Sequence, residues 1–533
     1  DRAVALTPNR GDRSSRAIAA ASMKFAAGDL PATSRLLVEA QTGPLTGLEQ
    51  VTAELLGAQV TFALSRGGDA PSQLLAAAAR LEPLNIDLAR QTYLQALIAT
   101  SYAGQLGDPE VRRAITQAAH QLPLDPTPTP AVQLLVHGVA TWMTAGFVAA
   151  APTLKDAVSQ YRNASPDSGF IGFGFNVMAM HLCDVEAWFE LCSGQAELAR
   201  KSGTLSWLPF ALDGLAEFHV HAGEFAQTEA VLVEAERIDP IIAATTSPRI
   251  ALLVAAWRGD APSAQQRIQS LTEAAASAGE GWLLSYAEYA KAVLYNGLAD
   301  YGAAAAAAQK ASDTAEHVPA LEVRGLYELV EALAHSDQRD RAAIAAAKLS
   351  AVAAATGTDW ANGMATRSHA LLAESDTADE LYREAIAWLS RTRMAIHLAR
   401  TRLVYGEWLR RQNRRIDARA QLRPAYESLA AMGAHGFAQR ARRELQATGE
   451  KVRRRTGPTA AELTPQEEQI AQLARERRTN TEIGAQLFLS ARTVEWHLGN
   501  IFAKLGIAKR RELDAALTRR EAGIKEGYPS SRV

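Results

Sequence analysis

The feature that most constrains this chain is a helix-ending pattern that recurs along most of its length. From residue 16 to about residue 445, apolar residues recur at the spacing of a helix face, and glycines followed by short polar turns interrupt them. Successive glycines lie 39, 36 and 38 residues apart (28 to 67, 223 to 259, and 259 to 297). A glycine suits the left-handed residue that ends a helix, and the Asp or Ala-Pro that follows suits the start of the next. We therefore expect helices in pairs, with turns at Gly28, Gly67, Gly223, Gly259 and Gly297.

Paired helices with a period near 38 residues are typical of TPR-like solenoids, in which each pair packs on its neighbours. Strand patterns are nearly absent, alanine is abundant, and aromatic residues make up only 6% of the chain. Small side chains favour helices and let them pack closely. We expect an all-α fold, with a TPR-like helical-repeat solenoid over residues 1–449 whose concave surface receives a partner or a small effector.

Two stretches interrupt the helical pattern. Leu122–Pro130 contains four prolines, which excludes a helix and predicts a loop between repeats. Asn163–Gly174 contains Ser-Pro-Asp-Ser and several glycines, and it predicts a second irregular segment. We interpret both as surface loops, with a ligand-facing insertion as the alternative.

The composition argues against several classes of protein. Cys183 and Cys192 are too few for a disulfide framework, so we interpret them as buried, reduced thiols of a cytoplasmic protein. No apolar run is long enough to span a membrane. His219 and His221 point to different faces of their predicted helix, so a metal site there is not expected. Neither a phosphate-binding loop nor a nucleophile motif occurs. We expect no metal, no cofactor, no catalytic residue and no enzyme activity in this chain.

The charges are distributed unevenly, although the net charge is only −2. Residues 391–533 hold 29 Lys and Arg against 15 Asp and Glu, whereas residues 1–390 hold 27 against 43. A basic end beside an acidic remainder indicates that the C-terminal part meets a polyanion, with a merely solvated basic surface as the alternative.

The C-terminal residues divide into three parts. Residues 450–458 are a basic linker that ends in proline, residues 459–524 carry repeated helix-starting signals, and residues 525–533 predict a flexible tail. Within the middle part we expect four helices, of which the fourth covers roughly Lys509–Arg519.

Two capping boxes begin the first two of these helices. Thr464 is a good N-cap with Glu467 three residues later, and Thr479 with Glu482 repeats the arrangement. Phe488-Leu489 then makes the tight turn into the third helix. Two short helices joined by a turn of about three residues form the DNA-reading arrangement of a helix-turn-helix.

The third helix, residues 490–505, has two distinct sides on a helical wheel. Its apolar residues fall within about 80° of Val494 and predict a core stripe, while the opposite side is free to meet DNA. The core stripe consists of Val494, Leu498, Ile501, Phe502 and Leu505. The opposite side carries Arg492, Trp496, Gly499 and Ala503, with Glu495 and Asn500 at its margins and Thr493 and Lys504 on one flank.

The outward tryptophan favours contact with a groove of DNA. An indole on the solvent side of a helix is unfavourable unless something covers it, so we predict that Trp496 meets DNA, with burial in the core as the alternative. Gly499 adds no bulk and lets the helix approach base edges, and Thr493 and Lys504 suit phosphate oxygens. The predicted DNA-binding residues are Ser490, Arg492, Thr493, Glu495, Trp496, Asn500 and Lys504.

Glu495 has two interpretations, which the sequence leaves open. Its carboxylate can accept a hydrogen bond from the amino group of cytosine. It can equally form an ion pair with Arg492, three residues earlier on the same helix.

These residues resemble the LuxR-type output domain. Leu463–Glu467 resembles the opening LTPRE of that family, and Thr481–Ser490 resembles KEIAxxLFIS. Arg492–Ile501 resembles RTVxxHLxNI, and Lys504–Ile507 resembles the closing KLGV. The resemblance implies a four-helix domain whose third helix reads the major groove and whose fourth mediates dimerisation. Many members have Lys where this chain has Glu495, which leaves the base preference open.

A second resemblance extends over most of the chain. The segments Ala399–Arg411, Ala431–Ala434, Arg442–Leu445, Arg80–Leu84 and Ala89–Leu94 resemble the large ATP-binding LuxR regulators of actinobacteria. Those regulators are similar in plan to the maltose-regulon activator, with a nucleotide-binding module, a helical-repeat sensor and a helix-turn-helix. This chain lacks that module and an initiating methionine, so we expect the C-terminal part of a longer protein or a sibling without the ATPase.

The expected function is sequence-specific DNA binding in transcription regulation. The expected partners are double-stranded DNA, RNA polymerase or another protein on the solenoid, a small-molecule effector, and a second copy through the fourth helix of the C-terminal domain. The alternatives are a helical-repeat scaffold for protein interactions, a fragment of a signal-transducing ATPase switch, and a sigma-factor-like region, although Trp496–Leu498 fits the LuxR type better.

Overall fold

The computed structural model of the chain describes residues 2–125, 129–163, 170–242, 248–313, 322–450, 465–487, 491–505, 507 and 509–521. Every regular element in these ranges is a helix, as the sequence predicts for an all-α fold. The chain divides into two compact units, residues 1–452 and 453–533. The division falls within the predicted basic linker at 450–458, of which only Glu450 is described, and the predicted tail at 525–533 lies outside the described residues.

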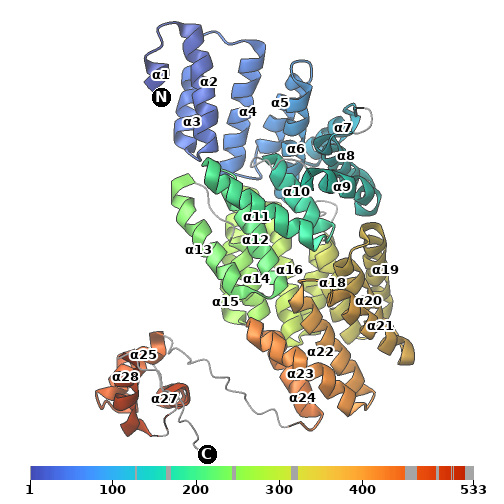
Figure 1. Ribbon diagram of the computed structural model, residues 1–533, viewed down its shortest axis with the longest axis vertical. Helices are drawn as coiled ribbons and strands as arrows, with labels where there is room; N and C mark the ends of the chain where they lie inside the picture. The colour runs from blue at the N-terminus through green and yellow to red at the C-terminus, as the bar shows by residue number, and fades with distance from the viewer. Residues whose placement is uncertain are drawn as a thin grey trace, which may run out of the picture. The chain divides into compact units, whose positions relative to one another are not determined.

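The first unit is an array of helices that pack side by side, most of them against the next in the chain (Figure 1). Short turns join most of them, so consecutive helices run in opposite directions and form the predicted pairs. In chain order they are α1 (Arg2–Ala5), α2 (Arg10–Ala26), α3 (Leu30–Ala40), α4 (Gly47–Leu64), α5 (Ala70–Leu81), α6 (Ile86–Ala103), η1 (Gly104–Leu106), α7 (Pro109–Gln121), α8 (Ala131–Ala145), α9 (Phe147–Arg162), α10 (Phe170–His181), α11 (Val185–Ser202), α12 (Leu208–Ala222), α13 (Phe225–Ile242), α14 (Arg249–Arg258), α15 (Ala261–Ala278), α16 (Gly281–Leu298), α17 (Tyr301–Asp313), α18 (Glu322–His335), α19 (Arg339–Thr356), α20 (Asp359–Leu372), α21 (Ser375–Leu389), α22 (Ala395–Arg411), α23 (Arg415–Met432) and α24 (His435–Ala447).

Left-handed glycines end several helices at the predicted turns. Gly28, Gly223 and Gly259 have φ angles of +83°, +78° and +70° and follow α2, α12 and α14. Only glycine adopts this conformation without steric cost, so the chain reverses there. The interpretation of these glycines as helix ends is confirmed.

A helix ends near Gly297, as predicted, because α16 ends at Leu298, but the predicted role of this glycine as the left-handed cap is wrong. Gly297 lies inside α16, and Ala299, with φ of +65°, is the left-handed residue that ends this helix. A Cβ atom on Gly297 would lie 3.0 Å from Cε2 of Phe437. Since α24 packs against α16, glycine is needed here for close approach of two helices and not for a turn.

The two predicted loops have different outcomes. Leu122–Pro130 separates α7 from α8, as expected, and Arg90 anchors it by donating from Nη2 to the Pro123 carbonyl (2.7 Å). By contrast, the irregular segment predicted at Asn163–Gly174 is wrong at its end, because α10 begins at Phe170. Gly174 sits within α10, where a Cβ atom would lie 3.1 Å from Cδ2 of Leu135, so this glycine also serves helix packing.

The array folds back on itself. In an open solenoid each repeat contacts only its neighbours. Here α9 packs against α19, α12 against α22, and α16 against both α6 and α24. The inner surface, which the sequence led us to expect as a free concave face, is therefore covered at these places by the array's own helices.

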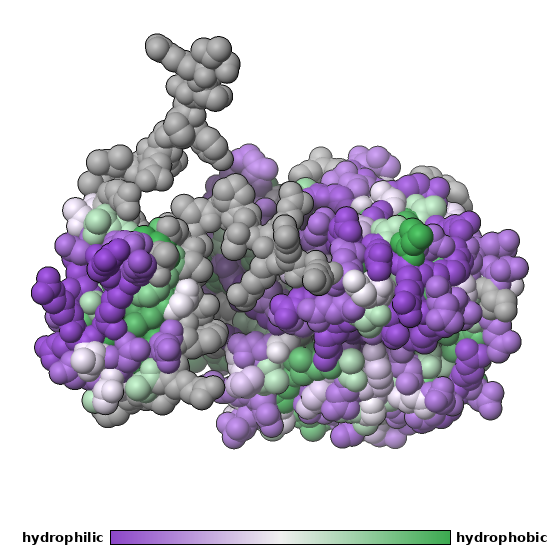
Figure 2. Space-filling view, turned by 90° about the horizontal axis from the view of Figure 1, so that it is seen from below, coloured by the Kyte–Doolittle hydropathy of each residue, from purple (hydrophilic) through white to green (hydrophobic). Residues whose placement is uncertain are grey.

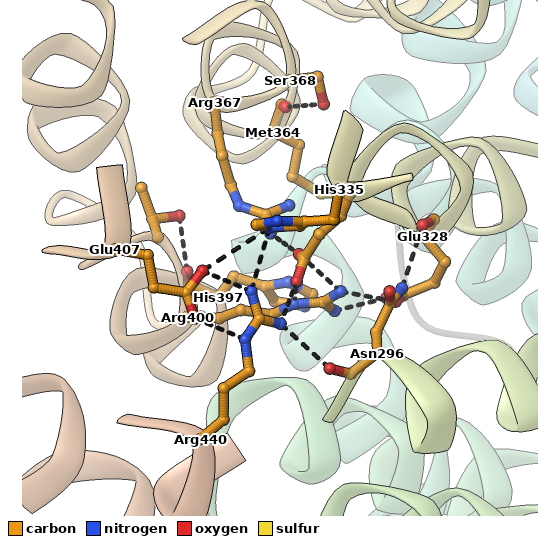
Figure 3. Close-up of polar contacts among 12 residues, drawn as sticks. Asn296, Glu328, His335, Met364, Arg367, Ser368, His397, Arg400, Glu407 and Arg440 are labelled. Atoms are coloured by element: carbon orange, nitrogen blue, oxygen red, sulfur yellow. Dashed lines mark hydrogen bonds and ion pairs between the residues drawn. The ribbon is translucent and has the colours of Figure 1, made fainter. Parts of the chain in front are cut away.

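Buried ion pairs hold the C-terminal half of the array together (Figure 3). Arg400 donates to Glu328 (2.6 and 2.7 Å) and to Glu331 (2.9 Å), and Arg440 donates to Glu331 and Glu407 (2.6 Å each). Burial alone would raise the pKa of Glu407, but the charge and hydrogen bonds of Arg440 outweigh it and hold that pKa at about 2. Three carboxylates and three guanidinium groups thereby link α18, α20, α22 and α24. The six residues are Glu328, Glu331, Arg367, Arg400, Glu407 and Arg440.

Cys183 and Cys192 are buried and form no disulfide, as predicted, and burial raises the pKa of the Cys183 thiol to about 12. On the face shown in Figure 2, hydrophilic side chains cover most of the described surface. Within the described ranges, no helix is both long and apolar enough to cross a membrane.

Candidate nucleic-acid interface

The second unit contains the helices predicted for DNA reading. They are α25 (Pro465–Arg475), α26 (Asn480–Leu487), α27 (Ala491–Leu505), the 3-10 turn η4 (Arg510–Glu512) and α28 (Leu513–Glu521). The fourth helix, expected over Lys509–Arg519, therefore begins as a 3-10 turn before the α-helix. There the backbone N–H of Lys509 donates to Oε2 of Glu512 (3.3 Å).

A small apolar core holds these helices around α27. Val494 and Ile501 are fully buried, Leu498 is nearly so, and Phe502 and Leu505 pack against them. This is the stripe predicted from the helical wheel, and the prediction is confirmed. The facing residues of the other helices are Ile470, Ala471, Leu473, Ala474, Ile483, Leu513 and Leu517.

A reciprocal capping box starts α26, the first helix of the helix-turn-helix pair. The backbone N–H and Oγ1 of Thr479 donate to Oε2 of Glu482 (2.7 and 3.0 Å), and the N–H of Glu482 donates to Oγ1 of Thr479 (3.3 Å). These hydrogen bonds lower the pKa of Glu482. The predicted box is confirmed here, whereas the predicted cap Thr464 and the turn at residues 488–490 lie outside the described residues.

Two long-range contacts fix α26 and α28 in the domain. Arg510 donates from Nη1 to Oδ1 of Asn480 (2.7 Å), and Nε of Arg475 lies 2.7 Å from Oδ1 of Asp514. The partners are 30 and 39 residues apart in the chain. The sequence offers no signal for either contact, because nothing local relates such distant residues.

The side of α27 that faces away from the core is open where it is described. A Cβ atom built on Gly499 would meet nothing within 4 Å, and Glu495 is exposed. Thr493, on the flank, is partly buried. A helix with an open, unobstructed side and a buried opposite stripe has the geometry needed to enter the major groove.

The remaining predicted DNA-binding residues are only partly described. The backbones of Arg492, Trp496, Asn500 and Lys504 belong to α27, but their side chains lie outside the description, and Ser490 lies outside it altogether. Their contacts with DNA, and the choice between the two interpretations of Glu495, stay predictions.

The histidines and acidic residues form no metal centre in the described part of the chain, where no group of three or more His, Cys, Asp and Glu could hold a metal ion. His219 and His221 do face different partners, as predicted. Nδ1 of His219 lies 2.6 Å from Oε2 of Glu224, and Nδ1 of His221 lies 2.9 Å from Nε2 of His397.

Residues 461–517 match the family described as bacterial regulatory proteins of the luxR family. Over 72 residues the chain is 39% identical to HTH-type transcriptional regulators of Mycobacterium bovis and of Mycobacterium tuberculosis, and 38% identical to another of Mycobacterium tuberculosis. These alignments cover 14% of this chain and 8% of each relative. The C-terminal unit is thus a luxR-type helix-turn-helix domain, and the chain spans only a small part of the relatives that it matches.

Solved structures show weaker likenesses. The Rap protein complexed with Competence and Sporulation Factor is 13% identical with a TM-score of 0.32, covering 75% of this chain and 98% of that one. The apo form of RapI is 12% identical with a TM-score of 0.28, covering 74% and 98%. Scores this low do not establish a shared fold.

Proposed function

We propose that this chain is a sequence-specific, DNA-binding transcriptional regulator whose helix α27 enters the major groove. The observation that carries the proposal is the luxR-type domain at residues 461–517, in which α27 buries one stripe and leaves the opposite side open at Glu495 and Gly499. A further support is the excess of basic over acidic residues at positions 391–533, since phosphate contacts supply much of the affinity of such proteins.

In this proposal the residues of α27 have distinct tasks. Arg492, Glu495 and Trp496 meet base edges, and Thr493 and Lys504 meet phosphates on one flank. Ser490 and Asn500 complete the interface at the start and at the margin of the helix. An Arg that contacts guanine discriminates against the wrong base by about 1–3 kcal/mol, so Arg492 is the residue on which we expect specificity to depend most.

The helical array regulates this output. We place the chain among the large ATP-binding LuxR regulators and assign to the array the binding of RNA polymerase, another protein or a small effector. The proposal includes a cytoplasmic location, no cofactor and no enzyme activity for this chain, and dimerisation through α28. Close packing between α9 and α19 and between α16 and α24 supports a regulatory role, because a ligand that alters one repeat then strains distant ones.

The test is selection of DNA sites from genomic fragments by the purified full chain, followed by binding measurements at two salt concentrations. We expect one two-fold-symmetric motif, with an affinity in the nanomolar range that falls steeply as salt rises. Trp496→Ala should weaken binding to the selected site more than binding to random DNA. The matched control is Trp388→Ala, because Trp388 lies in α21 and is partly exposed. This substitution should change neither binding to the selected site nor binding to random DNA.

Two outcomes would contradict the proposal. Equal losses of affinity for selected and for random DNA in Trp496→Ala would show that Trp496 does not contact the groove. Absence of any enriched motif, with the array still binding a protein partner after deletion of residues 456–533, would instead favour the scaffold function.

A further inference from the structure

A cavity lies inside the array where helices from its two halves meet. It has a volume of about 130 Å³ and is bounded by α6, α8, α10, α11, α12, α14, α16 and α18. Most of its wall is apolar, and many of the apolar residues are aromatic or methionine. The residues that define these apolar walls are Tyr102, Trp142, Met143, Phe173, Phe210 and Trp282. A cavity of comparable size lined by apolar side chains binds benzene in another protein, so this one has room for a single aromatic ring.

One end of the cavity is charged, and its charges are paired almost completely. Glu217 accepts hydrogen bonds from Nη1 of Arg249 (2.6 Å), from Nη1 of Arg324 (2.5 Å) and from the hydroxyl of Tyr286 (3.3 Å). Oδ2 of Asp213 accepts two hydrogen bonds from Arg249, from Nε (3.0 Å) and Nη2 (2.7 Å). The charges of the two carboxylates and the two guanidinium groups cancel, so this end of the cavity does not select a ligand by net charge.

One acceptor in this end is left over. Oδ1 of Asp213 is buried and has no hydrogen-bond partner in the described part of the chain. Oδ1 of Asn176, also in the cavity wall, has none there either. A buried oxygen without a donor destabilises the folded chain, so a ligand that supplies the missing hydrogen bond gains affinity. Burial raises the pKa of Asp213 in spite of Arg249, as expected for a carboxylate that lacks donors on one side.

We propose that this cavity is a binding site for a small, planar aromatic molecule that carries a hydroxyl or amine donor. The ring packs among the aromatic walls, and its O–H or N–H supplies the hydrogen bond that Oδ1 of Asp213 lacks. Shape and apolar area give the affinity, and the hydrogen bond to Oδ1 of Asp213 gives the selectivity. Binding itself needs only the array, while its effect on DNA binding rests on the function proposed above.

The first test compares two probes of nearly equal shape, p-cresol and p-xylene, by isothermal titration calorimetry on the full chain without DNA. The probes differ by one hydroxyl in place of one methyl group. We expect saturable one-to-one binding of p-cresol, at least fivefold tighter than binding of p-xylene, although p-xylene is the more hydrophobic. Absence of saturable p-cresol binding, or equal affinity for the two probes, would overturn the proposal.

The second test fills the cavity from one wall. Ser101 lines the cavity, and its hydroxyl donates only to the carbonyl of Leu97 within α6 (3.2 Å), so Ser101→Phe projects a ring into the space with little loss elsewhere. Ser22→Phe is the matched control, because Ser22 makes the same bond to Ile18 in α2 (3.1 Å) and is not part of the cavity wall. We expect at least a tenfold loss of p-cresol affinity for Ser101→Phe and none for Ser22→Phe. Equal binding by both variants would show that the probe sits elsewhere.

A third variant keeps the proposal testable if Ser101→Phe fails to fold. In Asp213→Asn the two N–H groups of Arg249 hold the amide oxygen, which turns the amide NH2 toward the cavity. The walls are unchanged, but the free acceptor has become a donor. Because a phenol hydroxyl donates more strongly than it accepts, the preference for p-cresol over p-xylene should weaken, and an undiminished preference would contradict the role of Asp213. None of these results bears on DNA binding, which is measured separately.

Discussion

His221 and His397 stack inside the array, with ring centroids 5.2 Å apart and Nδ1 of His221 2.9 Å from Nε2 of His397. The two residues come from α12 and α22 and are 176 positions apart in the chain. A hydrogen bond between the two facing nitrogens needs a proton on only one of them, and the lowered pKa values keep both rings neutral at pH 7. Burial lowers the pKa of His221 to about 3, with Arg324 adding to the effect and Glu217 opposing it. Burial, His221 itself and nearby arginines such as Arg400 hold the pKa of His397 far below its usual range.

The stacked pair predicts that the array loses stability in mild acid. Because the folded pKa lies below the unfolded value of about 6.5, the unfolded chain binds more protons between these values, and stability falls as pH falls below about 6.5. Each such histidine contributes a slope of about 1.4 kcal/mol per pH unit. Urea unfolding at pH 7 and pH 5 should show the loss, and His221→Asn should make the slope shallower. His435→Asn, which alters an exposed histidine, should leave the slope as it is, and a midpoint independent of pH would contradict the prediction.

Glu331 predicts a large and specific loss of stability. Its carboxylate accepts from Arg400 (2.9 Å) and Arg440 (2.6 Å) and contacts Arg367, and all four side chains are buried. Glu331→Gln keeps the shape but leaves buried guanidinium charge uncompensated, so we expect a cost of about 3–5 kcal/mol in the free energy of unfolding. Urea denaturation followed by circular dichroism measures it.

The control for Glu331 is an exposed ion pair of similar length. Glu190, whose side chain is 55% exposed, lies 2.6 Å from Arg162. Glu190→Gln should cost only about 0–1 kcal/mol, because water screens and solvates both partners. If the two substitutions cost the same, the buried network does not hold the helices together.

Substitutions of Gly499 should affect the stability of α27 and its affinity for DNA in different ways. Because no atom lies within 4 Å of a Cβ built there, Gly499→Ala should stabilise α27 by about 0.5–1 kcal/mol through helix propensity alone. Gly499→Leu should also fold, but its side chain keeps the helix away from base edges and should lower affinity for the selected site at least tenfold. Gly194→Leu makes the same change on the open side of α11 and should leave affinity intact. Wild-type affinity in Gly499→Leu would mean that another side of α27 faces DNA.

The capping box predicts a local effect in the helix-turn-helix. Thr479→Ala removes the hydroxyl that accepts from the N–H of Glu482 and should destabilise α26 by about 1 kcal/mol. That corresponds to roughly fivefold faster amide exchange in α26, measured by hydrogen exchange and mass spectrometry on the full chain. Thr479→Ser keeps the hydroxyl and should restore slow exchange. Unchanged exchange in Thr479→Ala would show that tertiary contacts alone hold this helix.

Much of the candidate site could be predicted because its determinants are local. The box between Thr479 and Glu482 and the stripe through Val494 and Leu498 depend on residues three or four positions apart, whose relation a helix sets directly. The orientation of Gly499 away from the core follows from the same geometry. The glycine turns of the array are local in the same sense.

Other features required the packing of distant helices. In the sequence, Gly297 fits the pattern of a helix-ending glycine. Only the packing of Phe437 from α24 against it shows that it serves close contact between helices. The cavity near Asp213 exists only because eight helices converge there, and the repeat spacing in the sequence does not predict that convergence.

The sequence by itself determined that this chain is a series of paired helices followed by a helix-turn-helix with a defined outward face, because helix starts, ends and apolar stripes depend on neighbours within one or two turns. Only the tertiary structure decided that His221 meets His397, that Glu331 joins three arginines and that one oxygen of Asp213 finds no donor among the described residues. The reason is physical. Such contacts depend on how far the array curves back on itself, and that curvature is the sum of many small packing angles that no local pattern records.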